Sequence, residues 1–458
     1  MCCVKSLQTK MASGELLAVT PSVGGTAMLD HLTLEEGSTD HVTPSERRSH
    51  WWRSAAVITG EIMGTGVLSL PNACARLGWV MGMSSSVLFG CTALYSGRLL
   101  SVCKNRLYPH ATSFSDLAHA TGGPRFALVT RGALMTGWAM ILPYYIVAAA
   151  SALAAAFPDA ELCYWQWSLV TMVFMAPVLQ LRSLHALSLL SGLSTAAIVI
   201  VLFALVPALV ASRSPTPQTQ LSVPSGQPFF KTYGALGSFI FAYQGQSIFL
   251  EIMREMRQPD HFPRALLSAN GLMMACYTII SAVAYGTHGA SVAAFLPDAL
   301  GEGWVRSVVG VLLAFHTAVS YLLTGQPLHR NVHLLLFPSS SAASAARGGR
   351  AARHWAIITL TFLAASFVIA NAVPFFSDFQ DLLGNLIGAS TVFGWPAFFY
   401  LRGMRLRGHP IPQIDVAVCG VYLLVCVPAF TLLGTANSVL HIVHDWQQSS
   451  APPFECRP

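Results

Sequence analysis

Charged side chains are scarce in this chain of 458 residues. Lys, Arg, Asp and Glu together make up 10% of it, whereas ordinary globular proteins carry about 25%. This share is too small to cover a soluble protein of 49.1 kDa with charged groups. Hydrophobic residues make up 53% of the chain and the mean hydropathy is +0.55, so we predict that lipid is its main solvent.

Motifs typical of catalysis and of metal binding are also absent. The ten cysteines form no CxxC pair, so the sequence indicates neither a zinc site nor a redox site. No HExxH, GxSxG or GxxxxGK(S/T) sequence occurs, which argues against a membrane enzyme and against an ATP-driven pump. The net charge of +6 comes without a basic patch interleaved with aromatic residues. We therefore expect no nucleic-acid partner and no cofactor other than a coupling ion.

Apolar segments account for most of the remaining sequence. A membrane-spanning helix needs about 20 mostly apolar residues. Eleven segments meet this requirement, at residues 54–75, 78–101, 126–156, 164–181, 185–211, 229–250, 265–289, 305–329, 354–375, 381–401 and 413–437. Residues 1–50 are polar and lack the apolar core of a signal peptide, so they are predicted to be a disordered cytosolic tail. Residues 51–437 are then the transmembrane domain, and residues 438–458 a short non-cytosolic tail.

Positive charge in the connections predicts the orientation. With the N-terminus in the cytosol, the cytosolic connections hold 14 Lys and Arg residues. The opposite connections hold four, which are Arg76, Arg213, Lys231 and Arg306. Because cytosolic connections are enriched in Lys and Arg, we predict a cytosolic N-terminus and a C-terminus on the other side. Cys163 and Cys456 then share the non-cytosolic side, but their spacing does not decide whether they form a disulfide.

Two of the apolar segments are interrupted by residues that do not favour a helix. The first segment contains Gly64, Thr65 and Gly66, and the middle of the sixth contains Tyr243, Gln244, Gly245, Gln246 and Ser247. Interrupted helices at corresponding positions of two five-helix halves indicate a transporter's substrate site. Free N–H groups suit a carboxylate and free carbonyls suit an ammonium, so the predicted ligand is an amino acid.

Other interpretations of the polar residues stay open. The side chains of the sixth segment either bind substrate or pair with backbone groups that the interruption frees. His316 and Asn371 are predicted to join neighbouring helices rather than to bind a ligand.

Glu61 places an acidic side chain inside the first segment, three residues before Gly64. Carboxylates within a membrane are rare and usually face the interior of the bundle. Because burial disfavours the charged form, Glu61 is a candidate for proton coupling. A neutral carboxyl that hydrogen-bonds between helices is the alternative.

The residues around both interruptions resemble the amino acid/auxin permease family. One match runs from Ile58 to Pro71 and on to Trp79, and the other runs from Ala235 to Leu266. The resemblance covers about residues 50 to 437. It implies an all-α integral membrane protein with eleven helices, built as a five-plus-five inverted repeat with discontinuous helices 1 and 6 and one extra helix.

The same resemblance implies a function. Family members are secondary transporters of amino acids, usually coupled to protons and in some branches to sodium. Many members carry no acid at the position of Glu61, so sodium coupling stays open, as does an amino-acid sensor that signals without net transport. The implied partners are an amino acid and the lipid bilayer, in a plasma membrane or a vacuolar or lysosomal-type membrane. Protein partners are not indicated.

The distribution of loop charges generates a topological prediction. The sequence has no Asn-x-Ser/Thr acceptor, so an engineered acceptor reports its own side of the membrane without background. An acceptor beyond Trp446 is expected to be glycosylated in a eukaryotic host, and one before Arg47 is not. The reverse pattern, measured as a mobility shift removed by glycosidase, would contradict the predicted orientation.

Overall fold

The computed structural model describes residues 49–181, 184–225, 229–337, 349–373 and 375–448, together with Phe454 and Cys456. All of these belong to the second of two units, Thr43–Pro458. Across the described ranges the secondary structure is helical, apart from an isolated bridge between Ser49 and Met256. Most of the predicted tail at 1–50 lies outside the described residues. The same holds for most of the part of the predicted tail 438–458 that follows residue 448.

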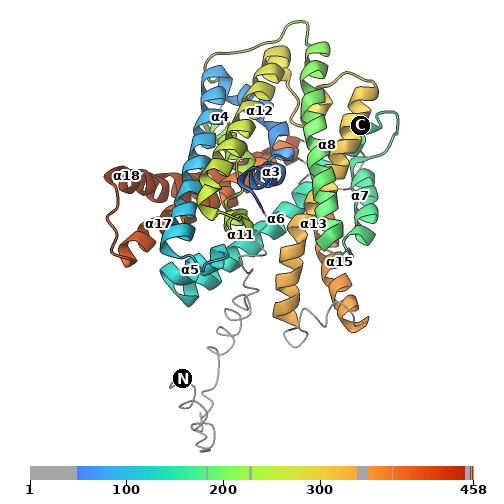
Figure 1. Ribbon diagram of the computed structural model, residues 1–458. Helices are drawn as coiled ribbons and strands as arrows, with labels where there is room; N and C mark the ends of the chain where they lie inside the picture. The colour runs from blue at the N-terminus through green and yellow to red at the C-terminus, as the bar shows by residue number, and fades with distance from the viewer. Residues whose placement is uncertain are drawn as a thin grey trace, which may run out of the picture. The chain divides into compact units, whose positions relative to one another are not determined.

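Helices occupy the apolar segments (Figure 1). The long ones are α4 (Leu70–Val102), α6 (Pro124–Ala156), α7 (Tyr164–Val178), α8 (Leu184–Ala211), α12 (Phe262–His288), α13 (Trp304–Leu336) and α15 (Gly349–Ala372). Shorter helices are α3 (Trp51–Ile62), α9 (Phe229–Gly234), α10 (Leu236–Ala242), α11 (Phe249–Glu255), α16 (Phe376–Leu383), α17 (Trp395–Leu406), α18 (Gln413–Val421) and α19 (Thr435–Gln448). Within the described residues, 8 helical stretches are long and apolar enough to cross a membrane.

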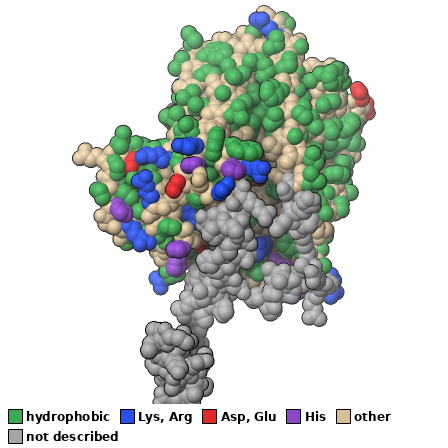
Figure 2. All heavy atoms as spheres, viewed as in Figure 1, with side chains coloured by type: hydrophobic (Ala, Val, Ile, Leu, Met, Phe, Trp, Pro, Cys, Tyr) green, Lys and Arg blue, Asp and Glu red, His purple; other side chains and the backbone are tan. Residues whose placement is uncertain are grey.

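The surface and the packing fit a membrane protein. α13 packs along α6 and α8, and α12 packs along α4 and α3. Outward-facing side chains include Phe203, which is 78% exposed, and Leu424, which is 80% exposed. Hydrophobic side chains cover much of the visible face in Figure 2. Such exposure is unfavourable in water and favourable against lipid tails.

Most of the Lys and Arg side chains on the visible face lie over its lower half (Figure 2). A short helix that the sequence analysis did not anticipate, α5 (Phe114–Gly122), lies there. It begins at a capping box, in which Ser113 accepts from the Asp116 N–H and Asp116 accepts from the Ser113 N–H. α5 packs against α17, which carries Arg405 in its last turn. This lower end of the helices is the one that the loop charges predict to be cytosolic.

Several predicted boundaries are displaced by a few residues, and two differences bear on the topology. The predicted end of the last segment, residue 437, falls inside α19, which continues to Gln448. Val439, Leu440 and Val443 remain exposed on this helix, so an apolar outer face extends beyond the predicted boundary. Arg76 was counted as a loop charge, but it lies within α4 and is buried.

Asn371 joins two helices as predicted. The Ser168 hydroxyl of α7 donates to the Asn371 side-chain oxygen of α15 at 3.1 Å, and the Asn371 amide donates to the Phe367 carbonyl at 2.8 Å. Both groups are thereby satisfied inside the helix pair.

Cys163 and Cys456 form a disulfide, a point that the sequence left open. The bond joins the start of α7 to the C-terminal end of the chain across a sequence separation of 293 residues. It requires both cysteines to be on one side of the membrane. Disulfides persist in oxidising compartments such as vesicle lumens and the cell exterior, which agrees with the predicted non-cytosolic location of both residues.

The disulfide generates a second prediction. Non-reducing proteolysis and mass spectrometry of the native protein should yield a cross-linked peptide pair containing Cys163 and Cys456. Cys163→Ser should remove this pair and lower the unfolding temperature, whereas Cys91→Ser, at an exposed free cysteine, should change neither. Detection of Cys163 as a free thiol in native membranes would contradict the bond.

Candidate functional site

The two sequence interruptions are places where the helices end. α3 ends at Ile62, and after Gly64 (φ −133°, ψ −145°) the chain forms a 3₁₀ turn, Thr65–Ser69. α10 ends at Ala242, and a second 3₁₀ turn, Gln246–Ile248, leads into α11. We call the stretches 62–66 and 242–246 the first and second breaks.

The breaks lie directly against each other. A Cβ atom on Gly66 would be 3.0 Å from the Cα of Ala242, and one on Gly245 would be 2.3 Å from Cδ1 of Ile62. At these two positions only glycine allows the observed approach of backbone to backbone or to side chain. Thr65 and Gly66 are buried here, whereas Gly64 is half-buried.

A tyrosine that the sequence analysis missed connects the ends of both interrupted helices. The Tyr277 hydroxyl of α12 is 3.2 Å from the Ala242 carbonyl and 3.4 Å from the Ile62 carbonyl. These carbonyls end their helices and have no following turn to supply an N–H donor. Tyr277 has no exposed surface, and a tyrosine in an apolar segment gives no sequence signal that separates it from ordinary core packing.

Gln380 makes a second connection from α16. Its amide donates to the Gly66 carbonyl at 3.0 Å and to the Ser238 carbonyl at 3.4 Å. Its own oxygen accepts from the Tyr144 hydroxyl at 2.8 Å. One fully buried glutamine therefore links the turn at the first break, the helix before the second break and α6.

The polar side chains of the second break have different surroundings. Gln246 accepts from the Gly245 N–H at 2.9 Å and donates to the Ser96 hydroxyl at 3.2 Å, so it satisfies backbone that the break frees. The Tyr243 ring packs on Tyr277 with 5.1 Å between centroids. Gln244 points to Gly388, where an added Cβ would lie 3.0 Å from its side-chain oxygen, and Ser247 is half-buried.

Glu61 lines a small polar cavity beside the first break, but by surface area the residue is exposed and not buried as the sequence analysis expected. The cavity has a volume of about 40 Å³, and its lining includes Glu61, Tyr145, Ser194, His316 and Thr324. This volume is enough for a water molecule or a small cation and too small for an amino acid. No Lys or Arg is among the lining residues, so the lining offers no cationic side chain to the Glu61 carboxylate.

His316 joins this cavity to the first break. Its Nδ1 is 2.8 Å from the Ser194 hydroxyl and 3.2 Å from the Ser194 carbonyl. The carbonyl only accepts, so this contact is a hydrogen bond when Nδ1 carries the proton. Nε2 of a neutral imidazole is then an acceptor, and it lies 3.1 Å from the position of a Cβ on Gly64. The predicted helix-joining role of His316 is confirmed by its bond to α8, and the side chain also touches the break.

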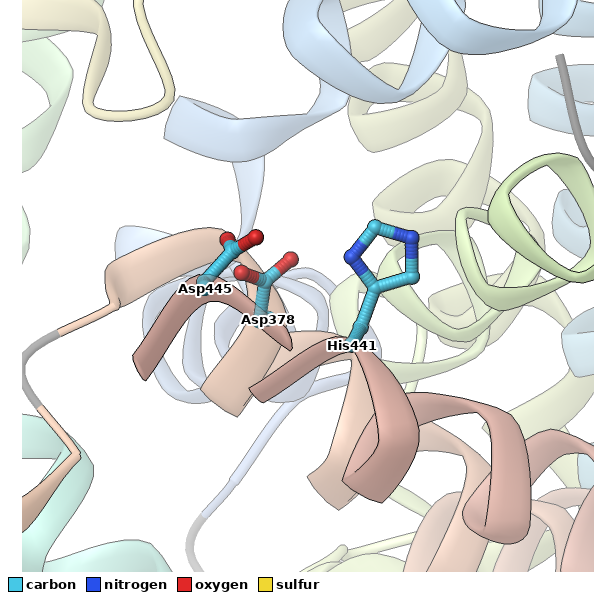
Figure 3. A group of neighbouring side chains, drawn as sticks. All are labelled: Asp378, His441 and Asp445. Carbon is cyan, nitrogen blue, oxygen red and sulfur yellow. The ribbon is translucent and has the colours of Figure 1, made fainter. Parts of the chain in front are cut away.

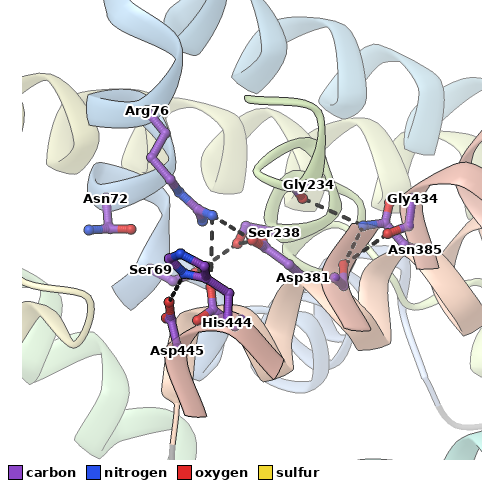
Figure 4. Close-up of polar contacts among 12 residues, drawn as sticks. Ser69, Asn72, Arg76, Gly234, Ser238, Asp381, Asn385, Gly434, His444 and Asp445 are labelled. Atoms are coloured by element: carbon purple, nitrogen blue, oxygen red, sulfur yellow. Dashed lines mark hydrogen bonds and ion pairs between the residues drawn. The ribbon is translucent and has the colours of Figure 1, made fainter. Parts of the chain in front are cut away.

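α16 carries two buried aspartates on the other side of the breaks. Asp378 faces α19 (Figure 3), and Asp381 faces Arg76 and Ser238 (Figure 4). Arg76 Nη1 is 2.8 Å from Asp381 and 3.9 Å from Asp378. The Ser238 hydroxyl donates to Asp381 and accepts from Ser69 at 3.3 Å. The pair therefore ties α4, α10 and α16 together, and removing one partner of such a pair typically costs about 3–5 kcal/mol.

The ends of α3 and α11 that lie away from the breaks are joined by backbone hydrogen bonds. Arg257, just after α11, donates its N–H to the Ser49 carbonyl at 2.9 Å. Ser49, just before α3, donates its N–H to the Glu255 carbonyl at 3.3 Å. The helices that lead to the breaks are therefore joined at the breaks, through Tyr277 and Gln380. They are also joined at the ends of α3 and α11 that lie away from the breaks.

The family model described as "Transmembrane amino acid transporter protein" matches residues 47–439. The chain belongs to this family. The match includes both breaks and the aspartates of α16 and ends within α19.

Several proteins that are similar to this chain are amino acid transporters. Amino acid transporter AVT3A of Arabidopsis thaliana is 25% identical over 83% of this chain and 87% of its own length. Amino acid transporter AVT1B of the same plant is 24% identical, over 85% of this chain and 71% of its own. The human vesicular inhibitory amino acid transporter is 24% identical, over 80% and 72%.

A solved structure shares the fold of this family member. It is a substrate-bound, outward-open Na⁺-coupled sialic acid symporter, with a TM-score of 0.54 and 12% sequence identity. The superposition covers 94% of this chain and 96% of the symporter. At this identity the likeness concerns the fold alone.

The contact between the breaks generates a third prediction. Gly66→Ala adds one methyl group against the Ala242 backbone, and overpacking of this kind costs about 1–3 kcal/mol. When this cost falls on a conformation that transport requires, the uptake rate drops about 5- to 160-fold. Gly271→Ala is the matched control, because an added Cβ there meets nothing within 4 Å. Equal uptake by the two variants at equal membrane expression would show that the contact is unimportant for transport.

Proposed function

We propose that this protein is a secondary active transporter that moves amino acids across a membrane and binds them at the two breaks. The observation that carries the proposal is the contact of the breaks, held by Tyr277 and Gln380, in a chain of this family. Relatives that are named amino acid transporters support the substrate class.

Backbone chemistry supports recognition of the invariant part of an amino acid. The carbonyls of Ile62 and Ala242 share one hydroxyl donor, so they retain lone pairs for an ammonium group. The 3₁₀ turn that begins at Thr65 starts with N–H groups that suit a carboxylate. The proposed site is Gly64, Thr65, Gly66, Tyr243, Gln244, Gly245, Gln246 and Ser247. Since Gly66 touches Ala242, substrate entry requires the breaks to move apart.

The proposal includes the eleven-helix, five-plus-five architecture. Gly78 has φ +76° and ψ 173°, a conformation that interrupts α4 after Leu77. The first helix of the proposed repeat is then α3, the 3₁₀ turn and residues 70–77, and the second begins at Trp79. α9, α10 and α11 together make the sixth helix, which corresponds to the first.

Proton coupling through Glu61 is the second part of the proposal. Its carboxylate faces the cavity, and His316 reaches from the same cavity to Gly64. A proton on Glu61 removes an uncompensated charge next to the break, so protonation and the arrangement of the break become linked. We propose that the proton enters with the substrate and leaves on the cytosolic side.

Sodium coupling is the second candidate, favoured by a specific feature of the same cavity. Its lining supplies the hydroxyl groups of Ser191, Ser194, Ser320 and Thr324 as well as the Glu61 carboxylate. Hard cations prefer oxygen ligands of this kind. A sensor without net transport would keep the site and fail to accumulate substrate.

The proposed setting is a vacuolar, vesicular or plasma membrane with the N-terminus in the cytosol. The basic residues over the lower half of the visible face and the disulfide near the C-terminal end support this orientation. One of the relatives is a vesicular transporter, which supports an internal membrane.

Uptake by reconstituted protein tests the function. Sealed vesicles are offered each of the twenty amino acids, with a pH gradient and a sodium gradient imposed separately. Accumulation above the equilibrium level under a pH gradient supports the proposal, and accumulation under sodium alone supports the second candidate. Binding without uptake under either gradient would support a sensor.

Replacement of Glu61 by Gln is the fourth prediction. Glu61→Gln keeps the shape of the side chain and removes its titration. The variant should equilibrate labelled substrate and exchange it for unlabelled substrate, but it should no longer accumulate substrate above equilibrium in a pH gradient. Glu161→Gln, at an exposed position outside the helices, is the matched control. Unchanged accumulation by Glu61→Gln would assign proton coupling to another group.

A further inference from the structure

A cluster of possible metal ligands lies where α16 meets α19, and the proposed transport function gives it no role. Asp378 comes from α16, and His441 and Asp445 come from α19 (Figure 3). One ligand atom from each residue lies within 4.8 Å of the other two. His441 and Asp445 are four residues apart, so they share one face of their helix.

The charge around this cluster favours a cation. Asp378 and Asp381 are 7% and 2% exposed, and Asp445 adds a third carboxylate beside them. Arg76 pairs closely with Asp381, at 2.8 Å, and is 3.9 Å from Asp378. Three carboxylates and one guanidinium leave two negative charges when His441 is neutral. One divalent cation balances this charge, and such balance matters because uncompensated charges are costly in buried surroundings.

The donor set indicates which cations fit. An imidazole nitrogen together with carboxylate oxygens is typical of zinc and related transition metals, whereas magnesium and calcium prefer oxygen alone. Around a tetrahedral zinc ion the ligand atoms are about 3.3 Å apart. Side-chain rotation of Asp445 and His441, both half-buried at the end of the bundle, can close the present separation. Water would occupy the remaining coordination position.

We propose that Asp378, His441 and Asp445 bind a divalent transition-metal ion of the zinc class. The ion joins α16 to α19 at the end of the bundle that carries Arg76. Gln380 and Asp381, on the same helix as Asp378, hold the elements around the breaks. Metal binding would therefore restrain α16, and this proposal is independent of which substrate the breaks accept.

Metal binding to the purified full-length protein tests the proposal. Zn²⁺ is titrated by calorimetry, and Co²⁺ is used as a spectroscopic probe whose visible absorption reports tetrahedral nitrogen and oxygen ligands. We expect one tight site per chain in the native protein. His441→Ala and Asp445→Asn should each weaken it at least about 100-fold, because loss of an outer-shell partner alone costs 10–100-fold. Acidification should also weaken binding, since His441 must be neutral to act as a ligand.

His409→Ala is the matched control. His409 is an exposed histidine between α17 and α18, and it lies outside the cluster. This variant should bind Zn²⁺ as the native protein does, with the same increase in unfolding temperature. His441→Ala, at the end of the bundle, avoids disturbing the Arg76 pair and should fold.

Two results would overturn the proposal. In one, Zn²⁺ binds equally to the native protein and to His441→Ala, so the metal occupies cysteines or other histidines. In the other, the native protein shows no saturable Zn²⁺ site, so the carboxylates share only a proton. Retention of the site in His409→Ala with its loss in the two ligand variants supports the proposal.

Discussion

A backbone carbonyl that ends a helix inside a membrane cannot bond to bulk water, so a donor from elsewhere in the protein must reach it. Two helices of this chain end in this way, at Ile62 and Ala242, and the surrounding arrangement follows from that requirement. Because the two ends are adjacent, the single hydroxyl of Tyr277 serves both. Moving either end away leaves a carbonyl without its donor, so the two ends are energetically coupled.

Long polar side chains from other helices extend this coupling. Gln380 bonds to the turn at the first break, to the helix before the second and to Tyr144. Gln246 returns to the backbone of its own break. These bonds give partners to backbone groups that the breaks free, which helps an interrupted helix to be stable among apolar neighbours.

The charged residues on the two sides of the breaks are arranged differently. On one side Glu61 faces a cavity lined by hydroxyls and His316, without Lys or Arg in the lining. On the other side Arg76 is paired with Asp381 and lies near Asp378. The first arrangement can change its charge by taking up one cation. The second is held by direct ion pairing and by Ser238, and its excess of carboxylates extends to α19.

In this structure the two breaks are in contact, so it shows one arrangement of the helices and not a transport pathway. In the proposed transport cycle, the contact of Gly66 with Ala242 opens while the donors around it are kept. Tyr277 and Gln380 come from α12 and α16, so the motion of these two helices relative to the breaks decides which backbone groups become available. The physical candidates for binding an ammonium are therefore the same carbonyls that the protein itself now satisfies.

Much of this protein could be predicted from sequence because the relevant signals are local. Apolar length identifies the helices, loop charge indicates an orientation, and Gly64, Gly66 and Gly245 mark where helices end. Glu61 is recognisable because a carboxylate inside an apolar segment is rare. The partners of these residues were not predictable. Long-range contacts join positions far apart in the chain, as in those of Tyr277 and Gln380 and in the disulfide between Cys163 and Cys456. The sequence analysis counted Arg76 as a loop charge, but in the structure it lies beside Asp381. Side-chain pairing depends on distances between helices, and only the tertiary structure sets those distances.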